Sequence, residues 1–388
     1  MSELNFIINF AKFGVGLVVH YVVASLFLVI NIFSFLLTQY QLYFGGKEKI
    51  TTRKNVVVIT GCDTGFGEAT SIRLAQMGFQ VVSACYSSEG AARLKDTVAL
   101  AVQCDVTKEE DIANLVEQTA SLLETKKLKL WGLVCNAGYE WTSLTLNEHA
   151  CHPSAAIFFT FLYILYFLNI PSLVWYSIGN SGAVDWISSS TFRRVLEVNL
   201  FGVVNVTKAF LPLLKQTRGA RIVNLSSVAG FLPAPMMSAY DASKHAVEGY
   251  AKALRLEMKP WNIHVSNVNP GFMRTPIVTG GPTLTAAEWE RVPDELKEQY
   301  DPLRPNPDTA MKYLLENPAL VVDAIQRAIT DRNPPMWYFP GIQSQFLFQH
   351  MTTPSTFMFM DRLWRLLPSS PEPQPKQEVV NAMQKPLK

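Results

Sequence analysis

The sequence predicts an α/β fold with a doubly wound parallel sheet, preceded by one transmembrane helix. Short runs of β-branched residues alternate with stretches of helical spacing, a glycine-rich turn follows the first run, and a long uncharged segment precedes them all. Hydrophobic residues make up 48% of the 388 residues and charged residues 17%, which excludes intrinsic disorder as the overall class. The formal net charge of +2 is too balanced for a protein whose main partner is a nucleic acid.

The uncharged segment runs from Phe13 to Leu37 and is long enough to cross a hydrocarbon core of about 30 Å as a helix. A cleaved signal peptide is the alternative, but only Lys12 precedes the segment as a basic side chain, and no Ala-x-Ala site follows it. Basic residues near a span stay on the cytoplasmic side, so we expect the rest of the chain to face the cytosol. Residues 1–54 are therefore predicted to be an anchor and a basic linker, whose cations are Lys47, Lys49, Arg53 and Lys54.

The first β-branched run, Asn55–Thr60, leads directly into a turn that contains Gly61, Gly65 and Gly67. Helical spacing follows over 68–77. Glycine allows a tight turn and a close approach of the main chain to a pyrophosphate, whose charge then lies at the positive end of the helix. The pattern indicates a Rossmann-type dinucleotide-binding domain. Further strands are expected at 79–85, 100–106, 130–135 and 221–225.

Six short motifs follow one another along the chain. They are T-G-C-D-T-G-F-G, N-A-G, V-N-L-F-G, N-L-S-S-V-A-G, Y-D-A-S-K and N-P-G, at Thr60–Gly67, Asn136–Gly138, Val198–Gly202, Asn224–Gly230, Tyr240–Lys244 and Asn269–Gly271. In this order they resemble the short-chain dehydrogenase/reductase family over residues 55–340. The resemblance implies an enzyme that transfers a hydride between NAD(P) and an alcohol or ketone.

The spacing of Tyr240 and Lys244 by itself indicates a chemical role for the pair. The two residues are four apart, so on a helix their side chains lie on one face. A phenol is a poor base near neutral pH, but an ammonium held beside it favours the phenolate. Tyr240 is then able to take the proton of an alcohol, or return it to a ketone, as the hydride moves.

Two further residues complete the predicted catalytic set. Ser227 follows the strand at 221–225, and parallel α/β sheets place their active groups at such strand ends. The resemblance implies that Ser227 hydrogen bonds to the substrate oxygen, with Ser226 as the alternative. It also implies that Asn199 holds a proton-relay water together with Lys244. The predicted catalytic residues are Ser227, Tyr240, Lys244 and Asn199.

The resemblance also implies which residues contact the cofactor. Asp105 and Val106 match positions that meet the adenine ring, and 136–138 match a loop that supports the central strands. The chain departs from the family in having Cys135 where an asparagine is usual. The predicted contacts are Gly61, Asp63, Thr64, Gly65, Phe66, Gly67, Asp105, Val106, Asn136, Ala137, Gly138, Tyr240, Lys244, Pro270, Gly271 and Thr275.

The cofactor is predicted to be NAD, with NADP as the alternative. After the second strand, a carboxylate would bind the ribose 2′-hydroxyl and an arginine would accept a 2′-phosphate. The residues there supply neither, and Thr64 rather than a basic residue precedes Gly65. The absence of a basic residue disfavours the 2′-phosphate of NADP more than the absence of an acidic residue disfavours the 2′-hydroxyl of NAD. The residues that follow the second strand are Cys85, Tyr86, Ser87 and Ser88.

A lipophilic alcohol or ketone is the predicted substrate. The Cys62-Asp63 pair resembles the branch of retinol, hydroxysteroid and D-3-hydroxybutyrate dehydrogenases, and the 270–276 segment resembles its retinol and steroid members. The anchor and the 270–276 segment favour the lipid members, and the apolar segment at 341–370 is either a substrate lid that faces lipid or ordinary core. D-3-hydroxybutyrate dehydrogenase is the alternative, although no cation is identified to bind its charged substrate. Outside the enzymes, the alternative is a catalytically silent nucleotide-binding or scaffold protein.

Residues 140–181 are a surplus relative to the family pattern, and 155–178 within them are uncharged. A single membrane crossing there would separate a strand and a helix that belong to one sheet layer. Two hypotheses remain: a helix lying at the membrane interface beside the active site, or non-native sequence from a faulty gene model. The segment contains His149, Cys151 and His152, which we interpret as incidental, and no metal is expected.

The remaining expectations concern partners, location and thiols. The resemblance implies a homodimer, and its microsomal members favour the endoplasmic reticulum membrane with the catalytic domain facing the cytosol; the mitochondrial membrane is the alternative. Residues 371–388 lack apolar periodicity and are predicted to be a disordered tail. The five cysteines show no C-x-x-C spacing, so reduced thiols are expected.

Overall fold

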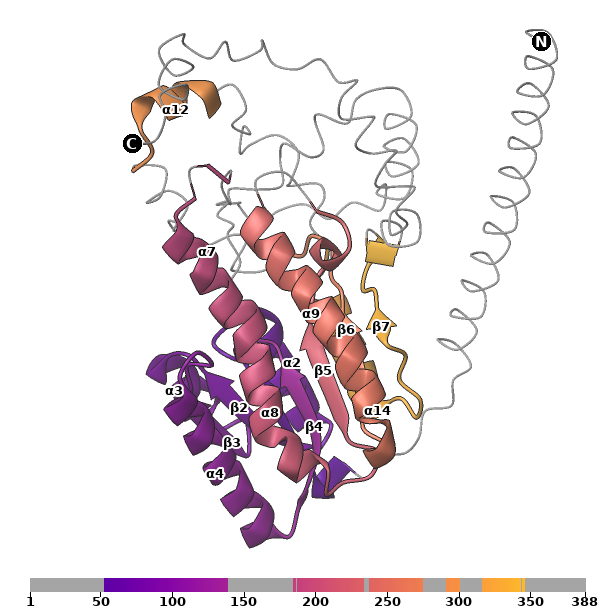
Figure 1. The fold of residues 1–388 in the computed structure, drawn as a ribbon. Coiled ribbons are helices and arrows are strands. Elements are labelled where there is room, and N and C mark those ends of the chain that lie inside the picture. The colour runs from indigo at the N-terminus through magenta and orange to yellow at the C-terminus, as the bar shows by residue number, and fades with distance from the viewer. Residues whose placement is uncertain are drawn as a thin grey trace, which may run out of the picture. The chain divides into compact units, whose positions relative to one another are not determined.

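A computed structural model describes residues 52–138, 184–185, 187–233, 237–274, 291–300, 316–342 and 344–345. Within them seven strands form one sheet in the order β3-β2-β1-β4-β5-β6-β7 (Figure 1). Every neighbouring pair is parallel. This confirms the predicted doubly wound parallel sheet. The strands are β1 (Asn55–Thr60), β2 (Gln80–Cys85), β3 (Leu100–Gln103), β4 (Lys129–Cys135), β5 (Arg221–Leu225), β6 (His264–Val268) and β7 (Trp337–Tyr338).

Side chains of the central strands alternate between two apolar cores, because successive residues of a strand point to opposite faces of the sheet. In β1, Val56 and Val58 belong to one core, whereas Val57 and Ile59 belong to the other. The first core is covered by α4 (Glu109–Lys126), α8 (Gly202–Leu214) and α9 (Ser238–Glu257). The second is covered by α2 (Gly65–Gln76), α3 (Ser88–Leu94) and α14 (Ala319–Thr330).

The order of the strands reverses between β1 and β4. From β1 the chain first moves outward to β2 and β3, then returns to β4 on the other side of β1 and continues to β7. A reversal of this kind is where open α/β sheets bind their ligands, in the crevice at the carboxyl ends of the two strands. The glycine turn follows β1, and the loop at 136–138 follows β4.

The third strand is shorter than predicted. It ends at Gln103 rather than continuing to Val106. The carboxylate of Asp105 accepts hydrogen bonds from the main-chain nitrogen and the hydroxyl of Thr107, at 3.0 and 2.7 Å. An aspartate that binds the main chain two residues ahead makes a turn, and this turn ends the strand.

One continuous helix of the described part of the chain, Ser189–Leu214, is long and apolar enough to cross a membrane. It consists of α7 (Ser189–Leu196), the π-helical turn η2 (Glu197–Phe201) and α8. Its buried residues Val206, Phe210 and Leu214 belong to the core beneath the sheet, and a core helix of a globular domain passes the same test of length and composition. We therefore assign Ser189–Leu214 to the domain core.

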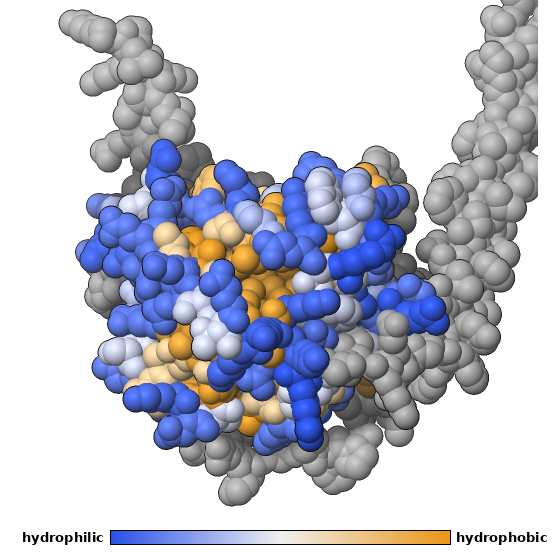
Figure 2. All heavy atoms as spheres, turned by 90° about the horizontal axis from the view of Figure 1, so that it is seen from below, coloured by the Kyte–Doolittle hydropathy of each residue, from blue (hydrophilic) through white to orange (hydrophobic). Residues whose placement is uncertain are grey.

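Several predicted segments lie outside the described residues. They are the membrane helix at 13–37, the surplus at 140–181 and the tail at 371–388; only four residues of 341–370 are described. Figure 2 shows the described domain from below the view of Figure 1, where hydrophilic residues surround a group of apolar residues near the middle of this face. The remaining short elements are η1 (Thr52–Lys54), η3 (Val228–Gly230), η4 (Lys259–Trp261) and α12 (Asp294–Tyr300).

Candidate active site

The glycine turn after β1 has the conformation and the open space that a phosphate cradle needs. Gly61 and Gly65 have φ values of +70° and +67°, in a region that side chains with a Cβ rarely adopt. No heavy atom lies within 4 Å of the position that a Cβ on Gly65 would take, so this part of the turn is open. Thr64 begins α2 without a side-chain cap, which leaves the first main-chain N–H groups of the helix for a ligand.

Gly67 is required for a different reason. A Cβ on Gly67 would lie 2.2 Å from the main-chain oxygen of Gly61 and 2.5 Å from Nδ2 of Asn136. The first turn of α2 thus packs directly against the end of β1 and the loop after β4. Only glycine fits at this contact, because the obstructing atoms include main chain.

Asn136 holds the crevice together from the β4 side. Its Nδ2 donates to the main-chain oxygens of Thr60 and Gly61, at 3.0 and 2.9 Å. The hydroxyl oxygen of Thr60 accepts hydrogen bonds from the main-chain nitrogens of Asn136 and Ala137, both at 3.1 Å. The loop after β4 therefore supports the glycine turn.

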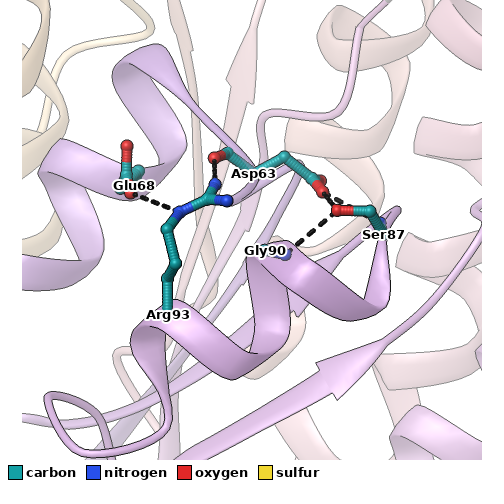
Figure 3. Close-up of polar contacts among 5 residues, drawn as sticks. All are labelled: Asp63, Glu68, Ser87, Gly90 and Arg93. Carbon is teal, nitrogen blue, oxygen red and sulfur yellow. Dashed lines mark hydrogen bonds and ion pairs between the residues drawn. The ribbon is translucent and has the colours of Figure 1, made fainter.

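The side chain of Asp63 reaches from the glycine turn to the end of β2. Its carboxylate accepts hydrogen bonds from the main-chain nitrogens of Tyr86 and Ser87, at 2.6 and 2.8 Å, and from the Ser87 hydroxyl at 2.6 Å. Figure 3 shows how the Ser87 hydroxyl also accepts from the nitrogen of Gly90 and so caps α3. A carboxylate is therefore present where β2 ends, although the residues after β2 supply none.

A cation also lies beside this carboxylate. The guanidinium of Arg93 donates to the main-chain oxygen of Asp63 and forms an ion pair of 3.5 Å with Glu68 (Figure 3). Sequence reasoning missed Arg93 and Glu68. Arg93 lies 25 positions after Glu68 and 30 after Asp63, so no short spacing pattern links the three residues. The carboxylate of Glu68 thus partly neutralises the charge of Arg93.

Asn199 lies in the π-helical turn η2. The main-chain nitrogen of Gly202 donates to the oxygen of Glu197, five residues earlier, so the turn holds one residue more than an α-helical turn. Such turns change the direction of a side chain within a helix. Asn199 is buried, its Nδ2 donates to the Ser243 hydroxyl at 3.1 Å, and it thereby contacts α9.

Tyr240 and Lys244 lie on the buried face of α9, one turn apart, as their spacing predicts. The Lys244 ammonium lies 5.4 Å from the centre of the Tyr240 ring and donates to the main-chain oxygen of Leu225 at 2.9 Å. A Cβ on Gly138 would lie 3.7 Å from Oδ1 of Asn199 and 4.0 Å from Nζ of Lys244. The loop after β4, η2 and α9 therefore meet at one point of the crevice.

Ser227 lies immediately before η3, two residues after the end of β5. Its hydroxyl oxygen accepts a hydrogen bond from the main-chain nitrogen of Ala229 at 3.2 Å. Ser226 points elsewhere: its hydroxyl is shut off from solvent and lies 3.1 Å from the position of a Cβ on Gly230. This burial favours Ser227 over Ser226 as the residue able to meet a substrate.

The other predicted residues are distributed around this crevice. Val106 packs against Gly202, where a Cβ would come within 2.8 Å of its side chain. Cys135 is buried, its sulfur lies 3.7 Å from the hydroxyl of Thr207, and burial raises the pKa of its thiol to about 12. The main-chain oxygen of Pro270 accepts a hydrogen bond from the main-chain nitrogen of Val228 at 3.1 Å, and Gly271 is the next residue. Thr275 lies outside the described residues.

The fold and this set of residues define a nucleotide-dependent oxidoreductase, and comparison with known proteins gives its family. The family model described as short chain dehydrogenase matches residues 55–154 and 176–282. The chain belongs to the short-chain dehydrogenase/reductase family, as its six motifs indicate. It is an NAD(P)-dependent alcohol dehydrogenase or reductase with a nicotinamide nucleotide cofactor.

Two curated relatives and one solved structure illustrate the similarity. Retinol dehydrogenase 5 of Mus musculus is 32% identical over 305 residues, which cover 75% of this chain and 82% of the relative. The 17-beta-hydroxysteroid dehydrogenase type 6 of Bos taurus is 30% identical over 321 residues, which cover 79% and 88%. The same fold occurs in the structure of 3-ketoacyl-(acyl-carrier-protein) reductase from Brucella melitensis complexed with NADH. The TM-score is 0.53 at 22% sequence identity, and the match covers 75% of this chain and 99% of that chain.

Proposed function

We propose that this protein is a membrane-anchored dehydrogenase that transfers a hydride between NAD and a lipophilic alcohol or ketone of the retinol or hydroxysteroid type. Ser227, Tyr240, Lys244 and Asn199 form its catalytic site. The observation that carries the proposal is the meeting of Asn199 and Lys244 beside Gly138, next to a glycine turn that is open to a ligand. Tyr240 and Lys244 share the buried face of α9 at this point.

Each residue has a distinct part in the reaction. Bound NAD would supply the hydride acceptor for an alcohol, and in its reduced form the hydride donor for a ketone. Tyr240 removes the proton from the alcohol oxygen, and the ammonium of Lys244 favours the phenolate that this requires. Ser227 donates a hydrogen bond to the same oxygen. Asn199, fixed by Ser243, holds a water that relays protons between Lys244 and solvent, outward during alcohol oxidation and inward during ketone reduction.

The surroundings of Asp63 support NAD rather than NADP. A 2′-phosphate would place two negative charges near the end of β2, where the Asp63 carboxylate already accepts from the available main-chain nitrogens. Arg93 is held by Glu68 and by the main-chain oxygen of Asp63. Like charges that face each other disfavour binding of a 2′-phosphate, and the guanidinium of Arg93 is already paired.

A substitution series tests this cofactor preference. Asp63→Asn keeps the size of the side chain and removes its charge, so we expect the ratio of kcat/KM for NADP to that for NAD to rise about tenfold, equivalent to about 1.4 kcal/mol. Glu68→Gln removes the ion pair of Arg93, so the double variant Asp63→Asn/Glu68→Gln should have a still higher ratio. Glu89→Gln removes the same charge from an exposed position of α3 and is the matched control. A ratio that stays unchanged in the double variant would contradict the preference.

The curated relatives support a lipophilic substrate, because their names include retinol and 17-beta-hydroxysteroid dehydrogenases. The apolar composition of 341–370 and the predicted anchor at 13–37 also favour a substrate that partitions into a membrane. We propose the endoplasmic reticulum membrane by resemblance to the microsomal members of the family, with the catalytic domain facing the cytosol because basic residues follow the predicted anchor. We also propose a homodimer, by resemblance to the family.

The surplus segment at 140–181 is either a native insertion or the product of a faulty gene model. The family match breaks over 155–175, within the surplus at 140–181, and resumes at 176. This break supports an insertion into a chain that otherwise follows the family pattern. Peptides from 141–180 in digests of the native protein would establish the segment as native sequence, and their absence beside good coverage elsewhere would support a faulty gene model.

The proposed activity is tested with detergent-solubilised protein. We expect turnover of all-trans-retinol or of a 3α- or 17β-hydroxysteroid with NAD, and loss of this turnover in Tyr240→Phe, which lacks the hydroxyl and retains the ring. Preferred turnover of D-3-hydroxybutyrate would favour the alternative dehydrogenase instead. Binding of NADH without turnover of any alcohol, both with and without residues 140–181, would favour a catalytically silent nucleotide-binding protein.

A further inference from the structure

Glu248 is a buried acidic residue that the proposed mechanism does not use. It lies on α9, four residues after Lys244 and eight after Tyr240, so all three side chains lie on the same buried side of the helix. Only 2% of its surface is exposed. Glutamate is almost never buried to this extent unless its oxygens are hydrogen bonded, because an unpaired buried charge is strongly unfavourable.

Both carboxylate oxygens of Glu248 accept hydrogen bonds from other elements of the sheet. Nδ2 of Asn269, the first residue after β6, donates to Oε1 at 2.6 Å. Nε1 of Trp337, the first residue of β7, donates to Oε2 at 2.8 Å. A carboxylate is the side chain that accepts from two separate donors with two equivalent oxygens, whereas an amide has one oxygen and a donor nitrogen.

The amide of Asn269 extends this network to the serine proposed for catalysis. The same Nδ2 also donates to the main-chain oxygen of Ser227, at 3.3 Å. On either side of Ser227, the nitrogen of Ser226 donates to Val268 at 2.9 Å, and that of Val228 donates to Pro270 at 3.1 Å. The main chain at 226–228 is therefore held to the segment that follows β6.

The opposite side of this turn packs against Glu248 itself. A Cβ on Gly230 would lie 2.9 Å from Cγ of Glu248 and 3.0 Å from the main-chain oxygen of Lys244. The turn η3 therefore lies directly against α9, and the glycine makes this approach possible. A change at Glu248 acts on Ser227 both through Asn269 and through this contact.

We propose that Glu248 is a positioning residue of the active site: by fixing the orientation of the Asn269 amide, it fixes the main chain of Ser227 and therefore the direction of the Ser227 hydroxyl. This inference rests on the proposed role of Ser227 in binding the substrate oxygen. Glu248 itself contacts neither substrate nor cofactor in this arrangement.

Glu248→Gln is the informative substitution, because it preserves size while replacing one acceptor with a donor. If the new amide oxygen faces Trp337, its NH₂ group faces the NH₂ group of Asn269. The Asn269 amide must then turn over, which places its oxygen toward residue 248 and removes the hydrogen bond to Ser227. We expect kcat to fall by up to about 100-fold, because a small misplacement of a reacting group has effects of this size. NADH affinity should stay within about twofold, since the altered contacts lie on the Ser227 side.

A second substitution provides a rescue. Trp337→Phe removes the donor to Oε2 and keeps an aromatic ring beside Phe231, whose ring centre lies 6.2 Å from that of Trp337. In Glu248→Gln/Trp337→Phe, the glutamine oxygen is free to face Asn269, so Asn269 resumes its hydrogen bond to Ser227. We expect Trp337→Phe alone to lower kcat less than about threefold, and the double variant to return to the level of Trp337→Phe. A merely structural role would make the double variant the worst of the three.

The experiment measures kcat and KM with all-trans-retinol and NAD, and NADH binding, of the full-length protein in detergent, for these variants and for Ser227→Ala. Hydrogen exchange of a peptide covering 224–231 is measured in parallel and needs no turnover. Faster exchange in Glu248→Gln, reversed in the double variant, is expected whether or not a substrate is found. Equal kcat and equal exchange in the wild type and Glu248→Gln, or absence of rescue in a folded double variant, would overturn the inference. Full activity of Ser227→Ala would instead refute the proposed catalytic role of Ser227.

Discussion

The ammonium of Lys244 donates a hydrogen bond to the main-chain oxygen of Leu225, with 2.9 Å between the two atoms. Leu225 is the last residue of β5, and Ser227 follows two residues later. This bond ties the helix that carries Tyr240 to the strand that leads to Ser227. The relative placement of the proposed base and the proposed oxygen-binding residue therefore depends on Lys244 as well as on the packing of α9.

Replacement of Lys244 tests this dual role. Lys244→Met keeps much of the apolar stem and removes the ammonium, so the phenolate of Tyr240 loses its stabilising charge. We expect kcat to fall by at least about 100-fold at pH 7, with residual activity that increases more steeply toward pH 10 than in the wild type. Steady-state kinetics from pH 6 to 10 check this. Lys252→Met, at an exposed position two turns later on α9, is the control, and equal kcat in the wild type and Lys244→Met would contradict the proposal.

The glycine turn gives a prediction in which two neighbouring glycines differ. In Gly67→Ala the new methyl group would lie 2.2 Å from the oxygen of Gly61, so α2 must move away from β1. In Gly65→Ala the space is open, and the cost is the positive φ, about 1–2 kcal/mol. We expect Gly67→Ala to abolish NADH binding or folding.

Gly65→Asn is the matched control for the turn, because asparagine tolerates a positive φ better than alanine does. Fluorescence titration with NADH and thermal unfolding distinguish loss of binding from loss of the fold. Tight NADH binding by Gly67→Ala would mean that the turn does not pack as described.

His264 predicts a dependence of stability on pH. Burial lowers the pKa of its imidazole to about 4, and the charges of Arg221 and Arg255 add to the shift. An unfolded chain takes up this proton near pH 6.5, while the folded protein does so only near pH 4. Between these values protonation favours the unfolded chain, so the contribution of His264 is complete above about pH 6.5 and is lost as the pH falls toward 4.

Denaturant unfolding from pH 4 to 7 measures this effect. We expect the free energy of unfolding to decrease toward low pH more in the wild type than in His264→Gln. His245→Gln is the control for the loss of a histidine on a helix. Parallel pH profiles for the wild type and His264→Gln would contradict the prediction.

The buried cysteines predict slow alkylation of the folded protein. The four described cysteines are free and buried, and burial raises the pKa of each thiol to about 12. The thiolate is the nucleophile, so almost none is present at pH 8. We expect iodoacetamide to leave these sites unmodified in the native protein and to modify them after unfolding. The sites are Cys62, Cys85, Cys104 and Cys135.

Peptide mass spectrometry measures the extent of alkylation at each cysteine separately. Cys85 is the most informative, because it ends β2 beside the residues that Asp63 holds. Rapid labelling of Cys85 in the folded protein, with Cys135 protected, would show that the end of β2 opens. Rapid labelling of all four would contradict the described core.

Local pattern was sufficient for most of the fold. The β-branched runs predicted β1, β2, β4 and β5 to within one residue at each end, because such runs fit a buried parallel strand. The third strand was predicted too long, since its apolar character continues past the point where Asp105 turns the chain. The π-helical turn at Asn199 has no periodic signature, because it adds one residue within an otherwise regular helix.

The sequence by itself determined β1, β2, β4 and β5, the glycine turn and the pairing of Tyr240 with Lys244, because each depends on residues that are neighbours along the chain. Only the tertiary structure decided which polar groups lie at the ends of the strands. Asp63 meets Ser87 across 24 positions, and Glu248 meets Trp337 across 89. Such contacts follow from the order of strands in the sheet, which brings distant segments to one edge. No local spacing encodes them.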